Sequence, residues 1–164
     1  MTPQLEPPYI PPWWGSDPIR YWIAPEMRRF EAEINMALLT FTRERMADGR
    51  ALRLRFQEIS APQQSRSIDF RLEPLNGLLA LGFYPPPLNQ EPQSGDVTMN
   101  STVDWNHPAC RPLVLPLLIH ELAAHSLGLG HLYLPESVRF PLVSAGKVNL
   151  APMDRQALVT IYGA

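Results

Sequence analysis

Three of the four histidines in the chain lie within twelve residues, and a glutamate accompanies them: His120, Glu121, His125 and His131. A hydrolytic zinc site needs three neutral imidazole or carboxylate ligands, an open position for water, and a nearby carboxylate that takes the proton. A single histidine on an apolar helix is usually a hydrogen-bonded core residue, but this segment contains every group that such a site requires. It therefore predicts metal binding by the three histidines, with Glu121 as the general base.

The spacing of the first two histidines sets a condition on the helix that carries them. Ala124 stands four residues after His120, and His125 stands five residues after it. In an ideal α-helix a step of four leaves two side chains about 40° apart, whereas a step of five leaves them about 140° apart. A single π-turn can absorb one extra residue and return His125 to the facing position. Gly128 can then leave the helix in a left-handed conformation and bring His131 back.

The elements that must position these residues can be predicted from hydrophobic periodicity. Alternation with a period of two predicts half-buried strands, and apolar residues at steps of three and four predict helices. Strands are expected over 19–24, 52–57, 68–72, 78–84 and 97–103, and helices over 25–47, 116–127 and 152–162. Strands that come first, two late helices and no internal repeat indicate an α+β domain.

Length and composition limit the classes of function. A chain of 164 residues predicts one domain, here residues 17–164, preceded by a proline-rich arm at 1–16. The net charge of −2 without a basic stripe gives no reason to expect nucleic-acid binding. The charge-free stretch 112–119 is far too short for a membrane helix, and one cysteine excludes an intramolecular disulfide. We expect no membrane association, a monomer by default, and no signal peptide within the first residues.

The histidine segment resembles a known protease motif. His120-Glu121 with the run His125–His131 is similar to the metzincin motif HExxHxxGxxH, and Leu-Gly-Leu-Gly-His is similar to its matrixin branch. Three other segments resemble the matrixin substrate-edge strand, the strand after it and the C-terminal helix: 77–85, 95–105 and 154–163. The resemblance implies a twisted mixed β-sheet with a long N-terminal helix, an active-site helix and a C-terminal helix.

The resemblance also implies a function. It implies a zinc-dependent endopeptidase in which His120, His125 and His131 hold one catalytic Zn²⁺ and Glu121 activates the zinc-bound water. The substrate, a peptide or protein, would lie along the edge strand at Leu78, Leu79, Ala80 and Leu81. The segment Pro141, Leu142 and Val143 resembles the wall of the S1′ pocket and favours an apolar side chain after the cut. Membership of this family would suggest a secreted protein.

The sequence departs from the matrixin pattern at the metal environment. Besides the extra residue before His125, Arg139 stands where the methionine of the tight turn beneath the metal belongs. A guanidinium there would repel a zinc ion, so Arg139 must find a carboxylate partner or point to solvent. The structural zinc and calcium ligands of the family do not map well onto this chain, and Leu81 stands where the edge strand would bring a histidine. We therefore expect no second zinc and have no basis for a calcium site.

These departures leave two other functions open. The first is a pseudoprotease or peptide-binding domain that keeps the metzincin fold but has lost zinc or catalysis. The second is a zinc hydrolase that acts on something other than peptides.

Overall fold

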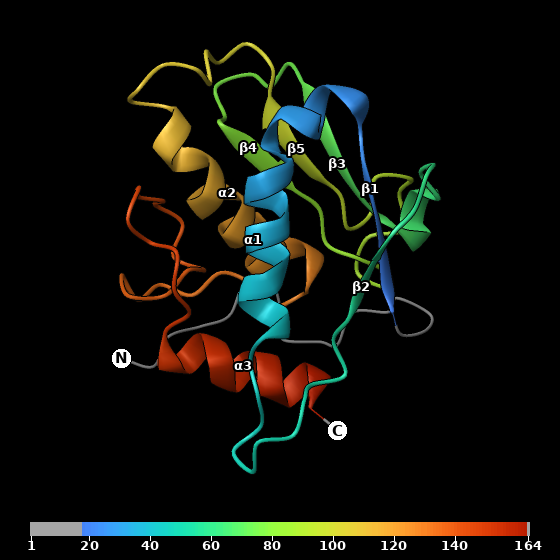
Figure 1. The fold of residues 1–164 in the computed structure, drawn as a ribbon, viewed down its shortest axis with the longest axis vertical. Coiled ribbons are helices and arrows are strands. Elements are labelled where there is room, and N and C mark those ends of the chain that lie inside the picture. Colours follow the sequence, from blue (N-terminus) through green and yellow to red (C-terminus); the bar gives the residue numbers. More distant parts are fainter. Residues whose placement is uncertain (1–17, 164) are drawn as a thin grey trace.

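The fold is built on one five-stranded sheet, which the computed structural model places among residues 18–163, the residues it describes (Figure 1). The strand order is β2-β1-β3-β5-β4, with every pair parallel except the antiparallel pair β4 and β5. The strands are β1 (Ile19–Ile23), β2 (Phe56–Glu58), β3 (Ile68–Glu73), β4 (Ala80–Gly82) and β5 (Val97–Asn100). The predicted arm at 1–16 lies outside the described residues.

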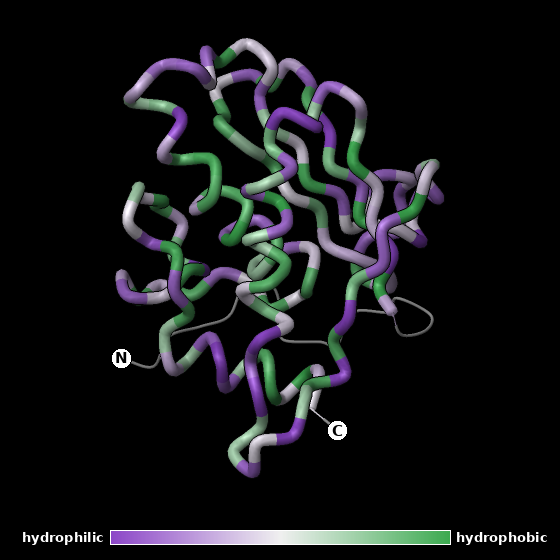
Figure 2. Tube along the Cα trace, in the orientation of Figure 1, coloured by the Kyte–Doolittle hydropathy of each residue, from purple (hydrophilic) through white to green (hydrophobic). Residues whose placement is uncertain are grey.

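Two helices cover one face of the sheet, and a third lies at the base of the molecule. Figure 1 shows α1 (Glu31–Thr42) and α2 (Val114–Glu121) in front of the strands, with α3 (Pro152–Tyr162) below them. Figure 2 shows hydrophobic residues along α2, which contacts both α1 and strand β4. The core side chains of the inner strands are fully buried: Phe70, Val97 and Met99. Burial of each contributes about 1.5–3 kcal/mol to folding. The α+β prediction is therefore confirmed.

The first helix is shorter than its predicted range and begins differently. Residues Pro25–Phe30 form a 3-10 helix, and the α-helical part ends at Thr42. The chain beyond it turns tightly, with Met46 bonded to Arg50 through the backbone and Gly49 at a φ of 87°. The predicted range extends past the real helix because Met46 in this turn, although only partly buried, still packs against the core.

The predicted strand at 52–57 is also shorter in the structure, where β2 begins only at Phe56. Leu52 and Leu54 are buried as the alternation predicts. The backbone N–H of Arg53, however, donates to the carbonyl of Tyr162 at the end of α3. This stretch therefore pairs with the C-terminal helix end rather than with the sheet, and only its last residues join β1.

Strand β4 forms the edge of the sheet. Its ladder with β5 extends beyond the strand at both ends, from Leu79, whose carbonyl accepts from Asn100, to Phe83, whose N–H donates to Asp96. Antiparallel pairing alternates along the strand, so the backbone N–H and C=O groups of Ala80 and Gly82 point away from β5. The edge thus offers a short row of backbone donors and acceptors beside α2.

Among residues 18–163, no helix has the length and hydropathy needed to cross a bilayer.

Candidate active site

The extra residue before His125 is absorbed by a π-helix. Helix α2 continues without a break into a π-helical turn, Leu122–Ser126, in which the N–H of Leu127 donates to the carbonyl of Leu122 at 2.8 Å. This turn places the side chain of His125 beside those of His120 and Glu121. Its Nδ1 lies 2.6 Å from Oε2 of Glu121, and its ring centre lies 6.2 Å from that of His120. The π-turn that the spacing required is confirmed.

Two glycines then return the chain toward the same point. Gly128 and Gly130 have φ values of 79° and 78°, in the left-handed region where a side chain would be strained. The N–H of Gly130 donates to the carbonyl of Ala124 at 2.9 Å, which folds the loop back over the π-helix. As a result the ring of His131 lies 4.9 Å from that of His125 and 5.4 Å from that of His120, centre to centre.

The three imidazole rings lie close together but do not form a complete metal-binding geometry. Within residues 18–163 no three histidine, cysteine, aspartate or glutamate side chains have their ligating atoms already arranged around a common metal position. The ring separations are nevertheless suitable. Zinc binds imidazole nitrogen at about 2.0–2.1 Å, which places the ring centres of two tetrahedral ligands about 5 Å apart. The observed separations of 4.9 and 5.4 Å are close to that value and the third, 6.2 Å, is longer, so the donor set fits zinc.

A hydrogen bond and burial set the chemical state of His120. Its Nδ1 lies 2.8 Å from the carbonyl oxygen of Val138. Because a carbonyl can only accept, Nδ1 carries the proton and Nε2 keeps its lone pair. Burial lowers the pKa of His120, which outweighs the opposing effect of the Glu121 charge. Both factors favour a neutral imidazole with a free Nε2, the form that binds a metal.

The edge strand comes very close to this cluster. A Cβ on Gly82 would lie 2.6 Å from Oε2 of Glu121 and 2.7 Å from Nδ1 of His125, so only glycine fits while those two side chains stay in place. The ring of Tyr84 meets that of His125 edge to face, with 5.0 Å between centres. Neither residue was predicted as part of the site. A glycine inside an apolar strand indicates close approach of another group, and that signal could have identified Gly82.

Comparison with known proteins decides the family. A family model described as matrixin matches residues 16–163. The chain belongs to the matrixin family. Its fold is also similar to that of myroilysin, with a TM-score of 0.59 at 12% identity over 88% of this chain and 79% of that one. A search of curated protein sequences gives no match. This matrixin is therefore a metalloprotease domain with a metzincin-like fold, and the resemblance inferred from its histidine motif is confirmed.

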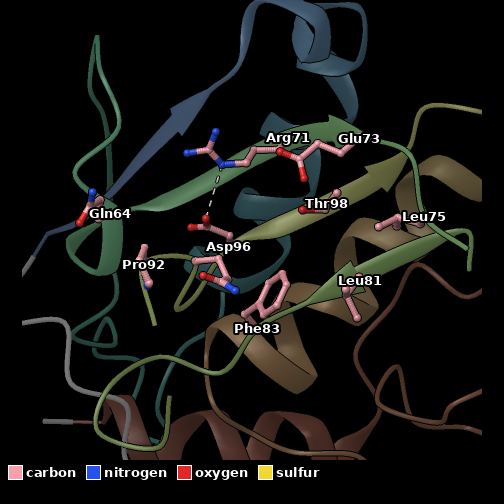
Figure 3. A pocket seen from close by; sticks show the side chains of 10 residues that line it. Gln64, Arg71, Glu73, Leu75, Leu81, Phe83, Pro92, Asp96 and Thr98 are labelled. Carbon is pink, nitrogen blue, oxygen red and sulfur yellow. Dashed lines mark ion pairs between the residues drawn. The ribbon is translucent and has the colours of Figure 1, made fainter. Parts of the chain in front are cut away.

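The residues predicted to bind substrate lie in two places on this matrixin. Leu78 and Leu79 are 47% and 41% exposed where the chain enters β4, while Ala80 is buried on the face that meets α2. Leu81 points to the opposite face of the sheet (Figure 3). The second group, Pro141, Leu142 and Val143, follows the turn after Val138, and Leu142 is 73% exposed. Contact of either group with a peptide stays a prediction.

Arg139 is buried in this matrixin, so the alternative that it points to solvent is wrong. The side chain is 2% exposed, and its Nε lies 2.8 Å from Oδ1 of Asp154, which is completely buried at the start of α3. The alternative in which a carboxylate neutralises it is confirmed. Because the guanidinium is bound to Asp154, its charge is compensated, and the main electrostatic objection to a metal beside this turn is removed.

A hollow lies on the opposite face of the sheet from the helices. Figure 3 shows the residues that line this cavity, which come from β3, β4, β5 and the loops beside them. The cavity has a volume of about 410 Å³. Arg71 pairs there with two buried carboxylates, at 2.9 Å from Asp69 and 3.6 Å from Asp96. Burial, followed by the charge of Asp69, raises the pKa of Asp96 to about 8.

This shift predicts a pH-dependent stability. The unfolded chain ionises Asp96 near pH 4, whereas the folded chain keeps the proton until about pH 8. The contribution of Asp96 to the free energy of unfolding is therefore complete below pH 4. It is lost between pH 4 and 8, at a rate of at most about 1.4 kcal/mol per pH unit. We expect Asp96→Asn to be more stable than the parent at pH 8 and similar to it at pH 4.5, as measured by urea unfolding. Asp104→Asn, at an exposed position, is the control, and parallel pH profiles for Asp96→Asn and the parent would contradict this prediction.

Proposed function

We propose that this matrixin domain is a zinc-dependent endopeptidase. The observation that carries the proposal is the convergence of three histidine rings and one glutamate across the π-helix, despite the altered spacing in the sequence. A structural core would have no need to gather three imidazoles within 6.2 Å of one another around a nearly buried carboxylate. Membership of a metalloprotease family supports the same chemistry.

His120, His125 and His131 would hold one zinc ion through ring nitrogens. When bound, zinc at a site of this kind lowers the pKa of a coordinated water and polarises the carbonyl of the bond to be cut. The chain prepares for this chemistry at two rings. The Val138 carbonyl contacts Nδ1 of His120, and the Glu121 carboxylate contacts Nδ1 of His125. With Nδ1 engaged in both rings, Nε2 is the nitrogen that would bind the metal.

Glu121 is the residue that would move the proton. Its carboxylate side chain is only 8% exposed and lies within the histidine cluster, where little bulk water competes for it. As general base it would accept a proton at a carboxylate oxygen from the attacking water and then deliver that proton to the leaving amine. The contact of Oε2 with Nδ1 of His125 keeps the carboxylate within the histidine cluster.

The substrate would be an extended peptide that adds to the edge of the sheet. The outward backbone groups of Ala80 and Gly82 can pair with a peptide main chain, as in strand addition. That edge lies against Glu121 and His125, since Gly82 approaches both side chains closely. A peptide bound there would bring its carbonyl to the cluster, and its side chain after the cut would lie toward Pro141, Leu142 and Val143.

The test is the zinc content and the proteolytic activity of protein purified without chelators or a histidine tag. We expect about one zinc per chain and cleavage of casein that a zinc chelator stops and added zinc restores. Peptide affinity that is indifferent to chelator, without cleavage, would instead favour a pseudoprotease. Zinc-dependent cleavage of other bonds with casein left intact would favour a different hydrolase.

A further inference from the structure

A buried ion pair between Arg139 and Asp154 holds the turn that contains Val138 and lies beside His120. Arg139 uses each nitrogen of its guanidinium on a different group: Nε donates to Asp154 at 2.8 Å, Nη1 to the Leu129 carbonyl at 3.1 Å, and Nη2 to the Met153 carbonyl at 3.4 Å. Its side chain thus joins the start of α3 to the loop before His131. A planar fork with donors in fixed directions is suited to such a task, whereas a lysine is not.

The backbone of Arg139 adds a second tie to the same loop. Its carbonyl accepts from the N–H of Leu132 at 3.2 Å. Leu129 and Leu132 flank His131 in the sequence, so Arg139 bonds to the loop on both sides of that histidine. The path of the loop that presents His131 is therefore set in part by a residue outside the loop.

Asp154 connects the same ion pair to His120. One carboxylate oxygen accepts from the Ser137 hydroxyl at 2.5 Å, and the other accepts from the N–H of Val138 at 3.0 Å. The carbonyl of Val138 in turn accepts from Nδ1 of His120. The ion pair thus holds the residue whose carbonyl orients the first histidine. All the groups in this chain of contacts are buried, so water does not compete with them.

We propose that Arg139 is a positioning residue that, through Asp154, orients the ring of His120 and sets the loop that carries His131. Removal of Arg139 leaves Asp154 as a buried charge without its cation, and the turn and the loop lose their common anchor. The histidine rings then sample other orientations. In the zinc enzyme proposed above, on which this part of the inference rests, affinity for zinc falls by about 10- to 100-fold, as when a ligand loses its outer partner.

The primary test uses the metal-free protein and the nitrogen-15 signals of its imidazole rings, so it remains valid even if the protein binds no zinc. In the parent, His120 should show a protonated Nδ1 and a bare Nε2. We expect Arg139→Met to mix the tautomers of His120 and to shift the signals of His131. Arg139→Lys keeps a cation for Asp154 but not the fork, so it should restore the His120 signals while those of His131 remain shifted.

Zinc affinity, measured by competition with a chelator, supplies the second readout. Arg111→Met is the matched control, because it removes another ion pair, with Glu33 at 2.8 Å, from the helical layer outside the histidine cluster. It should lower the unfolding temperature but leave the ring signals and the zinc affinity unchanged. Unchanged ring signals in the folded Arg139 variants would overturn the proposal. Failure of both Arg139 variants to fold would also overturn it, since Arg139 would then serve the stability of the whole fold.

Discussion

Glu121→Gln should retain zinc and lose nearly all proteolysis. Glutamine has the same shape and can still accept from Nδ1 of His125, so the hydrogen bond seen at 2.6 Å can persist. It cannot take a proton from water. General-base catalysis is worth about 10²- to 10⁴-fold in rate, so kcat/KM for casein or a derived peptide should fall by that factor, about 2.7–5.5 kcal/mol in barrier height.

The control for this variant is Glu26→Gln, which changes an exposed carboxylate on the 3-10 helix at Pro25–Phe30. It should have the kcat/KM of the parent. Zinc content must be measured on every sample, because a loss of metal would mimic a loss of base. Parent-like cleavage by zinc-loaded Glu121→Gln would show that another group takes the proton.

His125→Ala should lose both the metal and the activity. This histidine reaches the cluster only because the π-helix rotates it there, so its removal tests the consequence of the inserted residue directly. A change in the outer hydrogen-bond partner of a ligand already costs about 10- to 100-fold in metal affinity, and loss of a ligand should cost more. We expect about one zinc per chain in the parent and a clear loss in the variant.

His107→Ala provides the matched control, since it removes the one histidine that lies outside the cluster. His107 is exposed in a loop, where its Nδ1 accepts from the N–H of Ala109. It should bind zinc and cleave casein as the parent does. Equal zinc content in His125→Ala and the parent would mean that His125 is not a ligand, and the role of the π-helix would have to be sought in packing alone.

Local patterns predicted much of the fold because local interactions determine it. The helix at 152–162 was predicted at its observed bounds, since Pro152 fits a first helical turn and Gly163 follows the last apolar residue. The need for a π-turn could likewise be predicted from the five-residue spacing of His120 and His125 in the sequence, because helix geometry fixes the angle between their side chains. Where predicted elements were too long, as at the end of α1, a tight turn follows the helix, and its partly buried Met46 still packs against the core.

The partners of the site residues could not be read from any local pattern. The carbonyl that orients His120 belongs to Val138, and the carboxylate that neutralises Arg139 comes from α3. The sequence showed only that a cation buried in this turn would require an anion. Which anion serves depends on how α3 packs under the turn, and Gly82 likewise becomes part of the site only when β4 approaches α2.

The sequence by itself determined which side chains capable of chemistry this protein carries, and the tertiary structure decided how they are arranged. Three histidines and a glutamate in one short segment predicted a metal site and, with the flanking motifs, the matrixin family, and the comparison with known proteins confirms the family. Whether those side chains could meet was decided by the π-helix and the two left-handed glycines. The physical reason is that residue types fix which bonds are possible, whereas burial and long-range packing select which of them form.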